Sequence, residues 1–492
     1  MGGIDGAVRG GGASRIARAY EGASRQESSV RPIFVRIHDM ITDSVWFVPA
    51  SMAFLAGGFA FASVAADRSL GDQWAVNIGW IWSGSADGAR SVLAVVAGSV
   101  MTVVSIVFSL TITALAQTSS HFGPRVLRNF TSDRGVQVTL GTFIATFVYC
   151  LLVLRTVRSV AETPFVPFLS VNVGVALALA SLAVLIYFIH HVSEMIQAEN
   201  LIAGAGEAFQ AALPRLFPER IGRAERDEAA HAEDWRDARD ITADATGYLQ
   251  RIDDGHLMRL AVNHDLCCKL DRRPGEFVIR DAPLLRVQPA ERINPEIERE
   301  LRACFSVGAH RTSFQDALYS VQQLVEIAAH ALSPGINEPF TALTCIDWLG
   351  ASLRGVAGRN MPSPRRNDEH GRLRVVARVW SFAELAQAAF DQIRLYGASN
   401  PTVMMHLLDI IVDIAPLLRR KDDREVMKSH VRQIGEDAAQ IVNATDRERV
   451  RLRQQATLRA LTVRDDQPSL SDIDATRAIE EVAPEHDPAA KV

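Results

Sequence analysis

Seven hydroxyl and amide side chains recur three or four residues apart within one long apolar stretch of the sequence. They are Ser99, Thr102, Ser105, Ser109, Thr113, Gln117 and Ser120. At about 100° per residue they share one sector of a helix, while Val, Ile, Leu and Phe fill most of the rest. The next apolar stretch has a companion stripe, made of Thr139, Thr142, Thr146 and Tyr149.

Two polar stripes on apolar helices have two interpretations. If they face each other, Ser and Thr hydroxyls can replace the hydration of a permeating ion or water file without the cost of a buried charge. Small hydroxylated residues also let membrane helices pack closely, with hydrogen bonds worth roughly 0.6 kcal/mol each. Packing is their commoner use. Both interpretations hold together if copies of the chain associate along one edge of the stripe.

The segment after the first stripe combines basic and apolar residues. His121, Arg125 and Arg128 alternate with Phe, Val and Leu around Gly123-Pro124. This pattern is typical of an interfacial turn that contacts anionic headgroups, and a gate that pivots on the Gly-Pro pair is the alternative.

Another group of polar residues follows the last apolar stretch. It consists of His190, His191 and Glu194. These residues could hold a metal ion or carry a proton, but polar residues that anchor a helix at the headgroups are the commoner case.

Several acidic residues lie on or beside two successive helices predicted near residues 313–348. They are Asp316, Glu326, Glu338 and Asp347, with Asn337 beside them. If they converge, such acids can bind a metal or perform general acid–base chemistry. The chain has no P-loop, GxSxG, HExxH or kinase signature, and helix capping accounts for Asp316 and Glu338. We therefore expect no enzymatic activity, no metal site and no cofactor.

A tight loop joins these two helices. Its residues are Ser333, Pro334, Gly335, Asn337, Glu338 and Pro339. We expect this loop to fix the angle between the helices, with Asn337 satisfying backbone groups and Pro339 beginning the second helix.

The polar stripes belong to a set of four apolar stretches. None of the four contains Asp, Glu, Lys, Arg or His. They cover residues 45–66, 91–116, 136–154 and 166–189. Each is long enough to cross a hydrocarbon layer of about 30 Å at about 1.5 Å per residue. The sequence therefore predicts a mainly α membrane protein with four transmembrane helices. With no ionisable group inside these stretches, a coupled transporter is disfavoured.

The charges between the stretches predict the orientation. The leader, residues 1–43, carries six arginines, and Arg125, Arg128 and Arg134 lie between the second and third stretches. The loop after the first stretch is richer in Asp than in Arg. The positive-inside rule then places both termini in the cytoplasm of a bacterial inner membrane.

The rest of the chain is divided by composition. Residues 191–217 continue the fourth helix until Pro214, and residues 464–492 have the composition of a disordered tail. In residues 245–290, short apolar pieces alternate with Gly, Pro and Asp turns, which predicts a small β-module spaced like barrel-sandwich folds. Residues 294–460 read as an α-helical cytoplasmic domain, in which Asn294 caps one helix and Ser313 begins another.

Charge and cysteine content exclude some partners. The net charge of −5 gives no reason to expect a nucleic acid. The five cysteines show no paired CxxC spacing, so reduced packing thiols are expected rather than a zinc site.

Three segments carry a resemblance to a known family. They are residues 107–158, the RPGEF turn at Arg273–Phe277, and residues 311–350 with the block ALSPGINEPFTA. With them the chain resembles the bacterial predicted membrane proteins catalogued as domain of unknown function 2254. The resemblance implies an inner-membrane protein with a cytoplasmic domain and no agreed activity. Where that family often has Asn-Asp-Pro, this chain has Asn337-Glu338-Pro339.

The sequence thus predicts a homo-oligomer in the lipid bilayer that conducts or gates a small ion. The alternative is a non-conducting membrane anchor whose cytoplasmic domain senses or scaffolds. A membrane-bound enzyme that uses the acids near 316–347 is the third interpretation.

Overall fold

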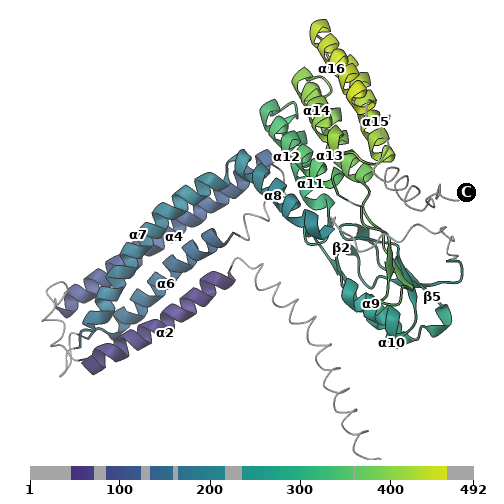
Figure 1. Ribbon diagram of the computed structural model, residues 1–492. Coiled ribbons are helices and arrows are strands. Elements are labelled where there is room, and N and C mark those ends of the chain that lie inside the picture. The colour runs from purple at the N-terminus through teal and green to yellow at the C-terminus, as the bar shows by residue number, and fades with distance from the viewer. Residues whose placement is uncertain are drawn as a thin grey trace, which may run out of the picture. The chain divides into compact units, whose positions relative to one another are not determined.

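The computed structural model describes residues 46–70, 85–122, 133–158, 165–216, 235–359 and 361–462. The chain forms two compact units that divide after Ile196, except that residues 120–122 group with the second unit. We call them the four-helix unit, before that residue, and the mixed unit, after it (Figure 1). The predicted leader and the predicted tail lie outside the described residues.

The four-helix unit consists of α2 (Phe47–Leu70), α4 (Ala86–Phe122), α6 (Arg134–Thr156) and α7 (Phe168–Met195). Each is long and apolar enough to cross a membrane, which confirms the four predicted helices. Of the 18-residue apolar segment of α6, 56% is buried inside the structure, against 22% of the corresponding segment in each of the other three helices. α6 is therefore the helix around which the unit packs.

The core of the four-helix unit is largely apolar. Near one end of α6 it contains Leu93, Cys150 and Val153, and near the other end it contains Phe143 and Phe188. Side chains from α4, α6 and α7 meet in both clusters, so α4 has one buried side.

A turn interrupts the predicted continuation of the fourth helix. α7 ends at Met195, and a new helix, α8 (Ala198–Leu216), follows after a turn at Ile196. Pro214 lies in the last turn of α8 rather than ending it. Ile202, Ala205, Phe209 and Leu213 form the buried face of α8. This face packs on α11 (Leu318–Ala331) and α12 (Pro339–Ala357), so α8 is part of the mixed unit.

Two sheets follow α8 where the sequence predicted one β-module. The five-stranded sheet has the order β1-β5-β3-β8-β7, and the three-stranded sheet has the order β4-β2-β6. The strands are β1 (Arg239–Thr242), β2 (Gly247–Ile252), β3 (Cys267–Leu270), β4 (Phe277–Val278), β5 (Pro283–Gln288), β6 (Phe305–Gly308), β7 (Arg365–Asn367) and β8 (Leu373–Val376). The barrel-sandwich expectation is not confirmed.

The sequence prediction fails at two places in this region. Asp254-Gly255, one of the Asp and Gly turns expected within residues 245–290, instead opens helix α9 (Asp254–Asn263), whose N-terminus is capped by the Asp253 side chain. Strands β6, β7 and β8 lie within the stretch predicted to be entirely helical. β8 pairs in parallel with β3, about a hundred residues earlier, and no local pattern reports such a pairing.

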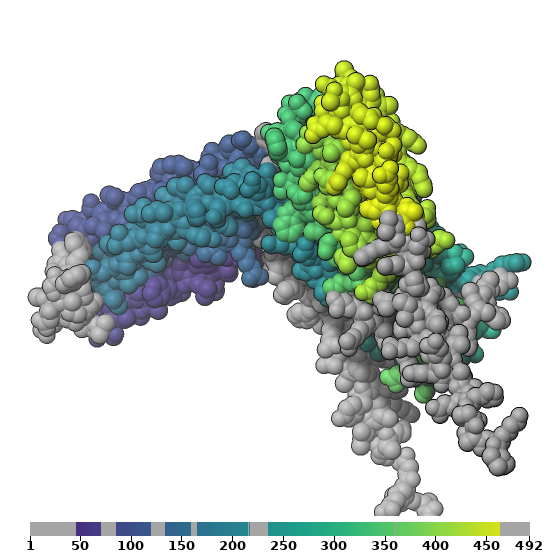
Figure 2. All heavy atoms as spheres, turned by 45° about the horizontal axis from the view of Figure 1, so that its top comes forward, coloured from purple at the N-terminus to yellow at the C-terminus, as the bar shows by residue number. Residues whose placement is uncertain are grey.

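The remaining helices are α10 (Pro295–Ala303), α11, α12, α13 (Phe382–Gly397), α14 (Pro401–Ile414), α15 (Lys421–Asp437) and α16 (Ala444–Thr462). The predicted cap at Asn294 is confirmed, since its side chain accepts hydrogen bonds from the Glu296 and Ile297 amides. From α11 on, the helices lie side by side in two rows, α11, α13 and α15 in one and α12, α14 and α16 in the other (Figure 1). α15 and α16 lie at the surface of the mixed unit (Figure 2).

Candidate functional site

The first polar stripe lies on the exposed side of α4. Ser99, Thr102, Ser105, Ser109, Thr113 and Gln117 are all exposed, and we call these six residues the outer polar face. The buried residues of α4, such as Leu93, Val100 and Val107, lie on the opposite side of the helix. The hydroxyls of Ser99, Thr102, Ser105 and Thr113 donate to carbonyls of their own helix, for example Thr113 Oγ1 to Ser109 O at 2.9 Å.

The second stripe points into the four-helix unit. Thr139, Thr146 and Tyr149 on α6 are buried, and Thr142 is half-buried. Thr146 Oγ1 lies 3.0 Å from Ser181 Oγ of α7. The two stripes therefore do not face each other across one path, because the first points outward and the second is packed inside. For α6, helix packing is the interpretation that the geometry supports.

The Thr146–Ser181 hydrogen bond gives a testable coupling. In a double-mutant cycle of Thr146→Val and Ser181→Ala, we expect a coupling free energy of roughly 0.6 kcal/mol, the usual value for a hydrogen bond between membrane helices. Unfolding in mixed detergent micelles measures it. Thr142 and Ser193, whose hydroxyls each bond within their own helix, provide a control pair with no expected coupling. Equal coupling free energies for both pairs would show that the Thr146–Ser181 hydrogen bond does not help to hold α6 against α7.

A buried carboxylate that the sequence analysis missed lies at the end of α2. Asp67, 6% exposed, accepts hydrogen bonds from the Leu169 amide at 2.8 Å and the Ser170 amide at 2.9 Å. These amides belong to the first turn of α7, where Pro167 supplies no side-chain cap. Asp67 therefore caps α7 from a neighbouring helix, and the positive end of the helix dipole stabilises its charge.

Hydroxyl groups extend this cap into the unit. Ser170 Oγ donates to Asp67 Oδ2 at 2.7 Å and lies 3.0 Å from Ser63 Oγ. Ser63 Oγ lies 3.0 Å from the Tyr149 hydroxyl, which also donates to Ser170 O at 3.1 Å. The cluster joins α2, α6 and α7. Asp67 was missed because it was counted as a loop charge, although Ser63, four residues earlier, lies on the same side of a helix.

Another aspartate caps the start of α6. Asp133 accepts from the Val136 amide at 2.9 Å, and Asp133 Oδ1 lies 2.9 Å from His191 Nε2. The His191 ring stacks on Tyr187 with a centroid distance of 5.3 Å, while His190 pairs with Glu194 on the surface. In the part of the chain that the structure describes, no three His, Cys, Asp or Glu side chains are grouped to hold a metal.

Most of the basic segment that follows the outer polar face lies outside the described residues. His121 is in the last turn of α4, but its side chain and that of Ser120 are not among the described ones. Arg125 and Arg128 lie outside the described residues.

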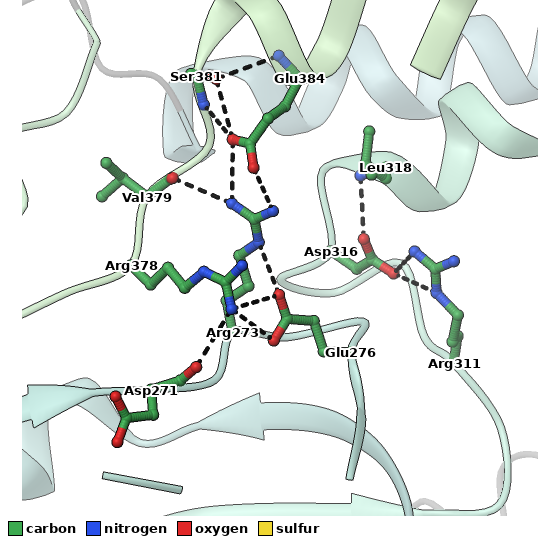
Figure 3. A network of polar contacts seen from close by, with 10 residues as sticks. All are labelled: Asp271, Arg273, Glu276, Arg311, Asp316, Leu318, Arg378, Val379, Ser381 and Glu384. Carbon is green, nitrogen blue, oxygen red and sulfur yellow. Dashed lines mark hydrogen bonds and ion pairs between the residues drawn. The ribbon is translucent and has the colours of Figure 1, made fainter. Parts of the chain in front are cut away.

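In the mixed unit, the RPGEF turn is part of a network of charged groups (Figure 3). Arg273 is buried and binds both carboxylate oxygens of Glu384, at 2.7 and 3.2 Å. Its guanidinium also donates to Val379 O and lies 3.2 Å from the centre of the Trp380 ring. Arg273 holds the pKa of Glu384 down to about 2. This arginine thus fastens the turn to the start of α13.

The same turn contacts the start of α11. Gly275 has a φ of +93°, and a Cβ on it would collide with the Asp316 carboxylate. Asp316 is buried, accepts from Arg311 Nε at 2.8 Å and from the Leu318 amide at 3.0 Å, and burial raises its pKa. Figure 3 shows Asp316 and Arg311 beside the Arg273 network. α11 therefore begins at Leu318, not near the predicted Ser313.

The acids near residues 316–347, which a membrane-bound enzyme would use, have separate partners. Asp316 binds Arg311, Asp347 Oδ1 lies 2.6 Å from His406 Nε2, and Glu338 accepts from Thr341 at 3.4 Å. Glu326 is half-buried on α11. None of these acids lines the pocket that is described below.

The loop between α11 and α12 is closed by backbone hydrogen bonds. The Asn337 amide donates to Ser333 O at 2.9 Å, and the Glu338 amide donates to Ala331 O at 2.8 Å. Asn337 has a φ of +52°, a left-handed conformation that asparagine tolerates well. Its conformation, rather than a side-chain cap, is what this turn requires. α12 begins at Pro339, as predicted, and Phe340 beside it is 78% exposed.

The Arg273–Glu384 pair predicts an acid-dependent stability. The pKa of Glu384 is about 2, below the ordinary 4.5, so its contribution is present above pH 4.5 and lost as the pH falls toward 2. We expect Glu384→Gln to lower the unfolding temperature near neutral pH, and the difference from wild type to shrink over this interval. Thermal unfolding in detergent measures it. A difference that stays constant down to pH 2 would contradict the linkage.

Four apolar spanning helices followed by a mixed helix-and-sheet unit define the class of this chain as an integral membrane protein with a large second unit. A family model described as "Predicted membrane protein (DUF2254)" matches residues 42–413. The chain belongs to this family of membrane proteins of unknown function, which confirms the resemblance.

The chain is also similar to two curated proteins that are described as uncharacterized. Uncharacterized proteins of Mycobacterium bovis and Mycobacterium tuberculosis strain H37Rv are each 32% identical to this chain over 388 residues. The alignments cover 77% of this chain and 73% of each relative. No solved structure matches the chain.

Proposed function

We propose that this protein forms homo-oligomers in the bacterial inner membrane, in which the outer polar face of α4 lines a path for a small ion. The observation that carries the proposal is the outward direction of this face. In one copy alone, six polar side chains on a membrane helix would face the hydrocarbon. In an oligomer they would face other copies and enclosed water.

The surroundings of the outer polar face support close association. A Cβ placed on Gly98, one turn before Thr102, would have no atom within 4 Å, so another helix can approach the backbone there. Ser105, Ser109 and Thr113 follow at the four-residue spacing that brings membrane helices together. Exposed Phe108 and Leu110 flank these residues and can meet lipid.

The proposed orientation has both termini in the cytoplasm. Four spans return the chain to the side on which it started, and the arginine-rich leader favours the cytoplasmic side. The mixed unit would then lie in the cytoplasm, where it can regulate the path. We propose no enzymatic role, because the acids near residues 316–347 have separate partners.

A non-conducting membrane anchor is the second candidate function. The packing of the α6 hydroxyls against α7 favours it, because the second stripe then has a purely structural role. In this case the outer polar face only joins copies of the chain, and the mixed unit acts as a sensor or scaffold.

Planar bilayers separate the two candidates. The proposal predicts discrete currents from the purified protein, reduced or abolished by Ser109→Leu or Thr113→Leu. Ser193→Leu is the matched control, since Ser193 is also exposed and, like Thr113, donates to a carbonyl four residues back, but lies on α7. A stable oligomer that gives no current supports the anchor. A monomer in nanodiscs that gives no current overturns the proposed oligomer as well.

A further inference from the structure

A pocket of about 570 Å³ lies at one end of the five-stranded sheet. β3 and β8 run parallel and begin there, and the antiparallel β5 ends there. The pocket is therefore lined by the end of β5 and by the residues that lead into β3 and β8. Neither the proposed ion path nor the family assignment gives this pocket a role.

Three arginines surround one aspartate in this pocket. Asp265 binds Arg374 Nη1 at 2.7 Å and Arg292 Nη1 at 2.6 Å, and Arg372 Nη1 lies 3.9 Å away. The nearby guanidinium groups of Arg374 and Arg292 lower the pKa of Asp265 to about 2, so the carboxylate is ionised. Asp265 thus lies within 4 Å of all three guanidinium groups, and Arg374 also pairs with Asp368.

The arginines are held in place by other contacts. The Arg374 side chain is 8% exposed, and its Nε donates to Asp368 at 2.8 Å. Asp368 also accepts from the Arg372 amide at 2.9 Å, which fixes the turn that leads into β8. Gly371, with a φ of +77°, lets this turn close. The Arg374 guanidinium is therefore held in one position by these contacts.

Asp265 itself occupies a position where glycine is usual. It follows α9 with a φ of +49°, and the Leu266 amide donates to Ala261 O at 2.8 Å, the hydrogen bond that closes a Schellman motif. An aspartate at this position is strained relative to glycine. This conformation places the Asp265 carboxylate between the three arginines.

The arginines have more donors than Asp265 can use. Each guanidinium carries five N–H donors in a planar fork, a shape that matches phosphate oxygens. Arg372 is too far from Asp265 for a hydrogen bond. Asp237 and Glu291, which also line the pocket, can accept hydrogen bonds from hydroxyl or amino groups.

We propose that this pocket binds a small organic phosphate of about nucleotide size. Its phosphate contacts Arg292, Arg372 and Arg374 and replaces Asp265 as their partner, and its hydroxyl or amino groups meet Asp237 and Glu291. The phosphate is favoured over a single carboxylate because it offers three oxygens and a larger charge to three guanidinium groups. This binding does not depend on whether the membrane helices conduct.

The experiment uses the full chain in nanodiscs, titrated calorimetrically with AMP, ATP and inorganic phosphate. We expect saturable binding of a nucleotide, weakened about tenfold or more by Arg292→Ala or Arg372→Ala, since each removes hydrogen bonds between charged groups. Arg449→Ala is the matched control, because Arg449 is 67% exposed, like Arg372 at 69%, but lies on α16. It should leave binding unchanged.

Asp265→Asn gives the result that a purely structural role would not produce. Asparagine also tolerates the left-handed conformation, but it removes the competing charge, so we expect tighter nucleotide binding. The proposal is overturned if neither nucleotide binds, if Arg449→Ala weakens binding as much as Arg372→Ala, or if Asp265→Asn weakens it. Inorganic phosphate binding as tightly as AMP would overturn the role of Asp237 and Glu291.

Discussion

Gly275→Ala is expected to destabilise the mixed unit by about 3 kcal/mol. Two costs add at this position. The φ of +93° is unfavourable for alanine, and the new Cβ would collide with the Asp316 carboxylate. Asp316 cannot move away easily, because Arg311 and the Leu318 amide hold it inside the unit. The substitution therefore strains the contact between the RPGEF turn and the start of α11.

Hydrogen exchange of the full chain in detergent measures this effect in peptides that cover β4 and α11. Gly371→Ala is the matched control, because its φ is +77° but a Cβ there would meet no atom within 4 Å. It should cost only the backbone strain of about 1 kcal/mol. Equal costs for the two substitutions would show that Asp316 does not limit the turn.

Asp67→Ala is expected to destabilise the four-helix unit by a similar amount, about 3 kcal/mol. The substitution removes the cap of α7 and leaves the Leu169 and Ser170 amides without their acceptor in a buried place. Asp67→Asn keeps one acceptor oxygen and should cost less. The loss of helix signal on titration with a denaturing detergent measures both.

Asp87→Ala provides the comparison for Asp67. Asp87 is in the first turn of α4, its side chain is 84% exposed, and it lies 3.8 Å from Arg90. An exposed pair of this kind contributes about 0–1 kcal/mol. If Asp67→Ala were no more damaging than Asp87→Ala, the carboxylate would not be the cap that joins α2 to α7.

The four spanning helices were predictable because a charge-free run of about 20 residues has few alternatives to a membrane helix. Their ends were less predictable. α2 continues beyond the predicted Ala66 to Leu70, because the charge of Asp67 is compensated by amides of α7, about a hundred residues later. Periodicity also located both hydroxyl stripes, but it does not say what a helix face meets. Only the structure separates the exposed stripe of α4 from the buried one of α6.

The mixed unit was predicted less well, for a related reason. Its helices follow their apolar spacing and their caps, as at Asn294 and Pro339. Strands β7 and β8 are only three and four residues long, and β8 is positioned by β3. The family resemblance pointed to RPGEF and to the segment after Arg311 separately. Their contact through Gly275 and Asp316 depends on the fold, as does the gathering of three arginines around Asp265.

The central claim is that four helices cross the membrane and leave the mixed unit in the cytoplasm. Cysteine labelling with a membrane-impermeant reagent tests it most directly, with single cysteines at Ser85, before α4, and at Val442, which is 94% exposed in the mixed unit. We predict that Ser85→Cys reacts from outside intact spheroplasts and Val442→Cys only in inverted vesicles. Reaction of both positions from the same side, or of Val442→Cys from outside, would contradict the account.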